Sequence, residues 1–192
     1  MQLHEVIRAD DPERAFREGG AIEALAAARR AGKIRLIGFT GHKSPVLHLA
    51  MLDAAAANGF RFDAVQMPLS VLDAQFDSFE RRVLPRLVEQ GAGVIGMKAL
   101  ADGRIVREGI ATAEEALAYA MSLPVSVVVT GCDSVERVRQ AIRIASGFRP
   151  LPEKEVEALL ARTAPKARGG ANELYKTTTG YDGTTQNPEW LG

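Results

Sequence analysis

The sequence predicts an α/β fold built on a parallel sheet, and three observations support this prediction. Five short apolar runs rich in β-branched residues alternate with amphipathic runs rich in alanine and leucine. The apolar runs begin at residues 2, 34, 62, 92 and 125. This spacing of about 30 residues suits one strand, one loop and one returning helix. The runs are nearly continuous in apolar residues, as is typical of strands covered on both faces.

Local signals bound the expected elements. The strands are expected at 2–7, 34–39, 62–67, 92–100 and 125–131, and the helices at 21–33, 45–58, 78–90, 113–122, 134–146 and 153–163. Ser44 before Pro45 is a typical helix start, and Thr112 with Glu115 forms a capping box. Gly59 is placed to end the helix that begins at Pro45.

Two further helices have acidic start signals. Asp77 with Glu80 is expected to open the helix over 78–90, and Asp133 with Glu136 the helix over 134–146. Pro85 is expected to kink the first of these two helices, because proline lacks the backbone N–H that a helix interior uses.

Alternating strands and helices build either an open doubly wound sheet or a closed eight-stranded barrel. Five units fill an open sheet, but they fill only part of a barrel and leave two strand edges unpaired. Strand order discriminates between the two, because a doubly wound sheet reverses its order at a switch point. Residues 1–163 are expected to form this domain, and the Gly-, Thr- and Pro-rich residues 164–192 an extended tail.

Composition narrows the classes of function. Lysine and arginine total 24, as do aspartate and glutamate, so the formal net charge is zero. Nucleic acids and anionic membranes select basic surfaces, and we therefore expect neither as a partner. The single cysteine, Cys132, allows no internal disulfide. No apolar run reaches the roughly 20 residues of a membrane span, and the first residues do not resemble a signal peptide, so we expect a cytoplasmic protein.

Several common motifs are missing from the sequence. Gly38 and Gly41 are the nearest match to a dinucleotide fingerprint, and the third glycine is absent. The phosphate-binding P-loop, the HExxH zinc motif, the GxSxG elbow and CxxC pairs are also absent. The three histidines lack the spacing of a metal site, and we expect no metal.

Five segments, each at the end of an expected strand, occur in the order found in one known family. They are LHEV (3–6), AGKIRLIGFTGH (31–42), AVQMPLSVLD (64–73), GVIGMKAL (93–100) and VTGCDSVERV (129–138), and LYKTTTGYDGTTQNPEWLG (174–192) closes the chain. Together they resemble the C-terminal part of an aldo/keto reductase, of a bacterial branch. The resemblance implies strands 4 to 8 of a (β/α)₈ TIM barrel, an enzyme type that reduces aldehydes and ketones with NADPH.

The resemblance also implies that part of the catalytic machinery is missing. Family members use a tyrosine as general acid, a lysine and an aspartate that tune its pKa, and a histidine that orients the carbonyl. His4 matches the histidine, whereas the other three positions belong to strands 1–3, upstream of Met1. We therefore expect an N-terminally truncated oxidoreductase, inactive alone, whose intact form takes a small carbonyl substrate.

The cofactor half of the family site is better represented. The resemblance assigns NADP(H) binding to Thr40, Gln66, Met97, Lys98, Leu100, Ser134 and Arg137. Gly41 stands where the family has an asparagine that holds the nicotinamide carboxamide, which leaves that contact open. Asp133 stands where many members have a basic residue and would repel the adenosine phosphate, which leaves the preference for NADPH over NADH open. A helix start such as that near Ser134 offers free backbone N–H groups to a phosphate, and arginine offers a fixed fork of donors.

Each of these residues also has a purely structural interpretation. His4 and Gln66 could be satisfied polar residues of the core, and Ser134 and Arg137 a helix cap and a solvated arginine. Two other hypotheses for the whole chain stay open. One is a non-catalytic half-barrel that binds a nucleotide or a partner, either by self-association or by pairing with the missing N-terminal strands. The other is an unrelated five-stranded α/β domain.

Overall fold

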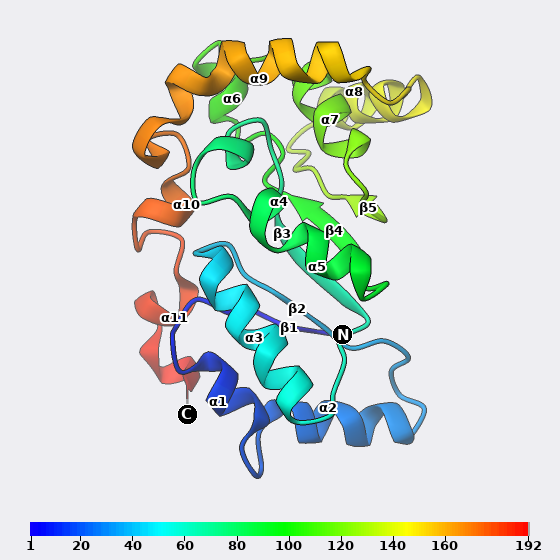
Figure 1. Cartoon of the computed structure of the whole chain (residues 1–192), viewed down its shortest axis with the longest axis vertical. Coiled ribbons are helices and arrows are strands. Elements are labelled where there is room, and N and C mark those ends of the chain that lie inside the picture. Colours follow the sequence, from blue (N-terminus) through cyan, green and yellow to red (C-terminus); the bar gives the residue numbers. More distant parts are fainter. Residues whose placement is uncertain (192) are drawn as a thin grey trace.

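The computed structural model describes residues 1–191 and contains one sheet of five parallel strands (Figure 1). The strands are β1 (Gln2–Leu3), β2 (Gly38–Thr40), β3 (Ala64–Pro68), β4 (Gly93–Met97) and β5 (Val127–Val128), and they neighbour one another in sequence order. This order contains no switch point, so the doubly wound alternative is wrong and the partial barrel is confirmed. Strands β1 and β5 form the two edges of the open sheet.

The parallel register brings the polar ends of three strands together. Thr40 of β2 lies opposite Gln66 of β3. Gln66 in turn lies opposite Ile95 of β4, and Pro68 lies opposite Met97. Because parallel strands end on the same side of a sheet, the loops that follow them gather at one rim.

Helices and helical turns occupy the connections. They are α1 (Asp11–Phe16), α2 (Ala21–Arg30), α3 (Pro45–Ala57), α4 (Phe79–Arg82), α5 (Leu84–Glu89), α6 (Arg104–Arg107), α7 (Ala113–Ser122), α8 (Val135–Ser146) and α9 (Glu153–Ala167). After α9 come the 3₁₀ turn η2 (Arg168–Gly170), α10 (Leu174–Thr177), α11 (Gly183–Gln186) and η3 (Pro188–Leu191); a further turn, η1 (Asp73–Gln75), follows β3. The segment expected as an extended tail therefore consists of short helical turns.

The helix starts follow the expected rules with two corrections. The Ser44 side chain accepts from the backbone N–H of Val46, and Thr112 forms its reciprocal capping box, both as predicted. The caps of α4 and α8 are Ser78 and Ser134, so the prediction of Asp77 and Asp133 as caps is wrong. Each serine oxygen accepts from a backbone N–H three residues on, which satisfies a donor that the first turn leaves unpaired.

The helix expected over 78–90 is interrupted near Pro85. Helix α4 ends at Arg82 and α5 begins at Leu84, with Val83 between them. A helix accommodates proline best in its first turn, where the missing N–H would have no partner, and Pro85 lies in the first turn of α5. The predicted kink is confirmed as a break into two short helices.

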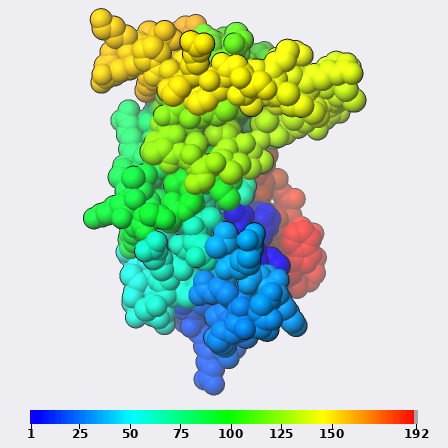
Figure 2. All heavy atoms as spheres, turned by 90° about the vertical axis from the view of Figure 1, so that its right-hand side faces the viewer, coloured from blue at the N-terminus to red at the C-terminus, as the bar shows by residue number. Residues whose placement is uncertain are grey.

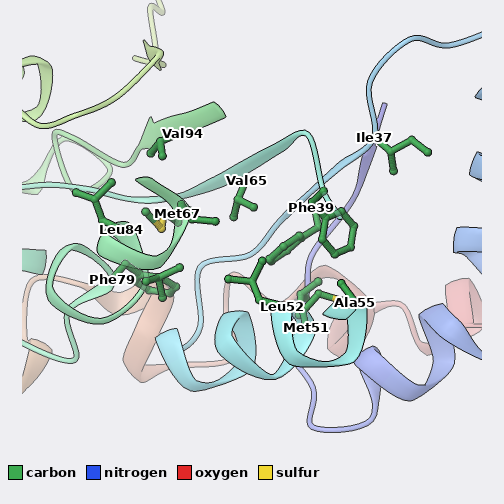
Figure 3. Packing of buried hydrophobic residues seen from close by; sticks show 14 of the residues in the cluster. Ile37, Phe39, Met51, Leu52, Ala55, Val65, Met67, Phe79, Leu84 and Val94 are labelled. Atoms are coloured by element: carbon green, nitrogen blue, oxygen red, sulfur yellow. The ribbon is translucent and has the colours of Figure 1, made fainter. Parts of the chain in front are cut away.

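The main core lies between the sheet and helices α3 to α5 (Figure 3). Phe39, Val65 and Val94 extend from β2, β3 and β4, and Met51 and Leu52 of α3 pack on the same cluster. The rings of Phe39 and Phe62 pack edge to face with their centroids 4.7 Å apart, a geometry that aromatic pairs favour.

The sheet edge formed by β5 and α8 is packed much less closely. Helix α8 has no buried residue along its whole length. Figure 2 shows this yellow part of the chain projecting from the body of the molecule. Within residues 1–191, no helix has the length and apolar character that a membrane span requires.

Core packing on β2 gives a direct stability test. Phe39→Ala removes a fully buried ring and is expected to lower the free energy of unfolding by roughly 3–5 kcal/mol. Leu36→Ala is the matched control, because Leu36 is 57% exposed just before the same strand, and it is expected to change stability by less than about 0.5 kcal/mol. Urea unfolding measures both, and equal losses would contradict this description of the core.

Candidate functional site

A cleft of about 760 Å³ opens beyond the carboxyl ends of β3, β4 and β5. Five of the residues that line it were predicted as site residues: Gln66, Met97, Lys98, Leu100 and Arg137. The other lining residues include Asp102, Gly103, Val106, Arg107, Ala113, Leu117, Val129, Thr130, Gly131, Cys132, Asp133, Gln140 and Ala141. This volume lies within the range of small-molecule and cofactor sites. The cleft also lies where barrel enzymes place their chemistry.

The floor of the cleft is built around the sulfur of Met97. The side-chain amide of Gln66 donates to this sulfur at 3.3 Å. The Thr40 hydroxyl contacts the same sulfur from β2 at 4.0 Å. Three neighbouring strands thus contribute one polar or polarisable side chain each, which leaves a surface suited to a flat ring.

The cleft wall carries both signs of charge. Lys98, Arg107 and Arg137 are cationic, and Asp102 and Asp133 are anionic. The guanidinium of Arg137 donates to the Gln140 side chain at 3.1 Å and is otherwise exposed. An excess of cations on one wall suits a ligand that is anionic at one end, and arginine forks match phosphate oxygens.

Three predicted site residues, Thr40, Ser134 and His4, do not line the cleft, and Thr40 only contacts the sulfur of Met97. The Ser134 hydroxyl caps α8, accepting from the backbone N–H of Arg137 at 3.2 Å. His4 is exposed just beyond β1, at the sheet edge farthest from the β5 side of the cleft. In a complete barrel a further strand would flank β1, so the exposure of His4 follows from the open edge.

Steric crowding explains why position 41 is a glycine. A Cβ atom there would collide with the carbonyl oxygen of Val6 and approach the ring of His48 to 2.9 Å. An asparagine therefore does not fit at this position as the chain is folded. The next residue, His42, is buried and its Nε2 lies 3.4 Å from a carboxylate oxygen of Asp182.

Comparison with known proteins decides the family. The sequence model of the aldo/keto reductase family matches residues 1–110, which is more than half of the 192 residues. The chain belongs to the aldo/keto reductase family. No curated protein matches the chain in a sequence search. The family fold is a (β/α)₈ barrel, and this reductase-family chain contains five of the strands in barrel order.

Aldo/keto reductases generally use NAD(P)H. The volume of the cleft, its cations and its polarisable floor at Gln66 and Met97 fit a nucleotide with a flat ring at one end and phosphates at the other. Two aspartates in the wall, Asp102 and Asp133, would repel the negative charge of a phosphate, so this wall attracts phosphate less than a purely basic wall would.

The tyrosines of this family member all donate to carboxylates. The hydroxyl of Tyr119 donates to Glu80, that of Tyr175 to Glu173 and that of Tyr181 to Asp102. Burial first, and then the neighbouring carboxylates, raise the pKa of the Tyr119 and Tyr175 hydroxyls, and the hydrogen bond to Asp102 raises the pKa of Tyr181. A raised pKa makes the phenol a weaker acid.

Five buried ionisable residues beside the strand ends were not anticipated. They are Glu5, Asp73, Glu173, Lys176 and Asp182. The ammonium of Lys176 lies 2.7 Å from Asp73 and 3.0 Å from Glu173. Among them only Glu5 had a sequence signal, because a strand over 2–7 would place it on the face opposite His4. In the structure β1 ends at Leu3 and Glu5 has a left-handed φ of 66°, so Glu5 lies in the loop after the strand.

His48 combines complete burial with a single weak hydrogen bond. Its Nε2 donates to the carbonyl oxygen of Gln66 at 3.4 Å, and in residues 1–191 its Nδ1 has no hydrogen-bond partner. The ring lies between those of Phe39 and Phe79 at 4.9 and 4.8 Å. Burial therefore lowers the pKa of His48 to about 4, because the charged form loses its hydration.

This lowered pKa predicts a pH dependence of stability. The unfolded imidazole titrates at 6.5 and the folded one at about 4. Below pH 6.5 the unfolded state binds more protons, so the contribution is complete above pH 6.5 and is lost as the pH falls toward 4. The expected loss at pH 4 is on the order of 3 kcal/mol.

The measurement is urea unfolding of the wild type and of His48→Leu between pH 7 and 4. The unfolding free energy of the wild type minus that of the variant should fall as the pH is lowered from 7 to 4, because leucine has no proton to gain. Carboxylates common to both proteins cancel in this difference. A difference that stays constant over the range would contradict a buried neutral imidazole.

Proposed function

We propose that this chain is the C-terminal part of an NADPH-dependent aldo/keto reductase, which transfers hydride between NADPH and an aldehyde or ketone. The observation that carries the proposal is the cleft, where five residues predicted from the sequence line one cavity at the strand ends. Family membership supplies the reaction class. The single cysteine and the balanced charge support a cytoplasmic location.

Each part of the cleft has an assigned role in this proposal. NADPH, when bound, supplies the hydride. Gln66 would bond the carboxamide of the nicotinamide, and Met97, which Thr40 and Gln66 hold from below, would pack on its ring. Lys98 and Leu100 would line the pyrophosphate, while Arg137 and the Ser134 helix start would take the adenosine phosphate.

We further propose that the chain is N-terminally truncated and inactive by itself. The aspartate, tyrosine and lysine of the family's catalytic set would come from strands before β1, and His4 would be the one catalytic residue present. Burial raises the pKa of Tyr119 and Tyr175, and the hydrogen bond to Asp102 raises that of Tyr181, which disfavours any of the three as a replacement acid. The two sheet edges support the same view, since the missing strands would pair with them.

Nucleotide binding and turnover test the two parts of the proposal separately. The wild-type chain is expected to bind NADPH in a fluorescence titration and to leave a panel of aldehydes and ketones unreduced. Arg137→Ala is expected to weaken NADPH binding by about 10- to 100-fold, because a hydrogen bond to a charged group is worth about 1.5–3 kcal/mol. NADH lacks the 2′-phosphate on the adenosine ribose, which is the phosphate assigned to Arg137, so its binding should be affected less.

Arg139→Ala is the matched control, since Arg139 is an exposed arginine of the same helix that does not line the cleft. Its affinity should stay at the wild-type value. Equal weakening by both variants would show a general charge effect and remove Arg137 from the site. NADPH consumption well above background would remove the claim of inactivity.

A second candidate function is a partner-binding half-barrel without chemistry, and a specific observation favours it. Five large apolar side chains are exposed within one short stretch of β5 and α8: Val127, Val129, Val135, Val138 and Ile142. Contiguous exposed apolar surface is typical of interaction sites, and an unpaired strand edge adds free backbone groups. In this proposal the partner is a second copy or a polypeptide that carries the missing strands.

Association is tested by introducing one charge into this surface. Ile142→Glu is expected to shift the chain toward monomer in sedimentation velocity, because burying an unpaired carboxylate is costly. Ser146→Glu adds the same charge at an exposed position near the end of α8 and should leave the distribution unchanged. A wild-type chain that is monomeric at all concentrations would rule out self-association.

A further inference from the structure

The segment 173–187, termed here the C-terminal strap, runs past the ends of four strands. Figure 1 shows it descending from α9 toward α1, beside the strand ends. It contacts the loop after β1 through Glu5 and Arg8, the loop after β2 through His42 and Lys43, the loop after β3 through Asp73 and Phe76, and the loop after β4 through Lys98 and Asp102.

Three of these contacts are made by groups that do not line the cleft. The Glu5 carboxylate accepts from the backbone N–H groups of Gly183 and Thr184 at 2.8 and 2.9 Å. Asp182 pairs with Lys43 at 2.8 Å. The side chain of Lys176 is only 1% exposed beside Asp73. None of these groups lines the cleft, so a ligand in the cleft does not reach them.

The fourth contact belongs to both the strap and the cleft. The Lys98 ammonium lies 5.0 Å from the ring centre of Tyr181 and 5.5 Å from that of Tyr175. It also lies 3.7 Å from the Asp102 carboxylate, which accepts from the Tyr181 hydroxyl at 2.8 Å. The same lysine and aspartate line the cleft, with side chains 25% and 49% exposed.

We propose that the strap and an anionic ligand of the cleft compete for the Lys98 ammonium. An anion bound beside Lys98 would attract the ammonium away from the tyrosine rings. It would also repel Asp102, which accepts the hydrogen bond of the Tyr181 hydroxyl. The strap would then loosen at Tyr181 while its three other contacts hold it in place. This proposal rests on the cleft of the proposed function, and it adds a regulatory role for the strap.

Competition between two contacts is reciprocal. If the anion loosens the strap, then weakening the strap contact must raise the affinity for the anion by the same factor. A cation over an aromatic ring at a partly exposed site is worth about 0.5–1 kcal/mol, which corresponds to about two- to fivefold in affinity. Tyr181→Leu, which removes the ring and the hydroxyl at a half-exposed position, is expected to bind NADPH tighter by this factor.

Hydrogen exchange of the strap is the second measurement, and its first comparison, between the wild type and Lys98→Met, needs no ligand. Lys98→Met removes the charge and keeps a long side chain, and it should speed exchange in peptides that cover residues 174–182. Lys154→Met replaces an exposed lysine of α9 and should leave these peptides unchanged. Saturating NADPH added to the wild type should speed their exchange, and inorganic pyrophosphate should act in the same direction.

The outcomes separate this proposal from the proposed function. Unchanged exchange in Lys98→Met, or slower exchange when NADPH binds, would overturn the competition. If neither NADPH nor NADH binds but pyrophosphate still speeds strap exchange, the nucleotide assignment fails and the competition stands. If no anion changes strap exchange while Tyr181→Leu binds NADPH no tighter, the competition fails and the nucleotide assignment stands.

Discussion

The constraint on which this structure depends is the parallel direction of its five strands. Parallel strands all end on one side, so the loops that follow β1 to β5 must share a single rim. This direction brings Gln66, Met97 and Arg137 into one cleft although they are far apart in the sequence. It also allows one short C-terminal segment to contact four loops in turn.

The strap is anchored most strongly by a buried ionic cluster. All three ammonium protons of Lys176 have acceptors: Asp73 at 2.7 Å, Glu173 at 3.0 Å and the carbonyl oxygen of Phe76 at 2.7 Å. A buried charge is tolerated only when it is paired and hydrogen-bonded, and removing one partner typically costs about 3–5 kcal/mol. The second oxygen of Glu173 has no hydrogen-bond partner among the described residues. Burial raises the pKa of that carboxyl, so the cluster fixes the strap at a cost in desolvation.

The sequence predicted the elements well because their signals are local. Helix α7 begins and ends at the predicted residues, since its capping box lies within four positions of the chain. The parallel direction of the strands followed from the repeat of strand and helix, whereas the strand order followed only from the resemblance to a barrel family, because the repeat also suits a doubly wound sheet. The cleft residues on β3 and β4 followed from the resemblance to the family, since each lies in a segment that the resemblance covers.

What the sequence could not predict depends on long-range contacts or on unusual backbone angles. Lys176 and Asp73 are 103 positions apart, and no local pattern pairs them. Lys98 adopts a left-handed backbone angle, with φ of 55°, which directs a strand-end lysine toward the strap. His4 illustrates a different limit. The role that the resemblance implies for His4 stays a prediction, because at the open edge of this sheet its side chain is exposed to solvent.

The other open edge of the sheet, at β5, links the cleft to the surface of β5 and α8. Arg137, Gln140 and Ala141 lie on the cleft side of α8, whereas Val135, Val138 and Ile142 are exposed on the helix. Helix α8 has no buried residue, so few packing contacts fix the position of the Arg137 guanidinium. A contact that covers the exposed valines and isoleucine would immobilise α8 and lower the entropy that a ligand must overcome to order Arg137. Association at this edge and anion binding in the cleft should therefore favour each other, in contrast to the proposed competition between the strap and the anion for Lys98.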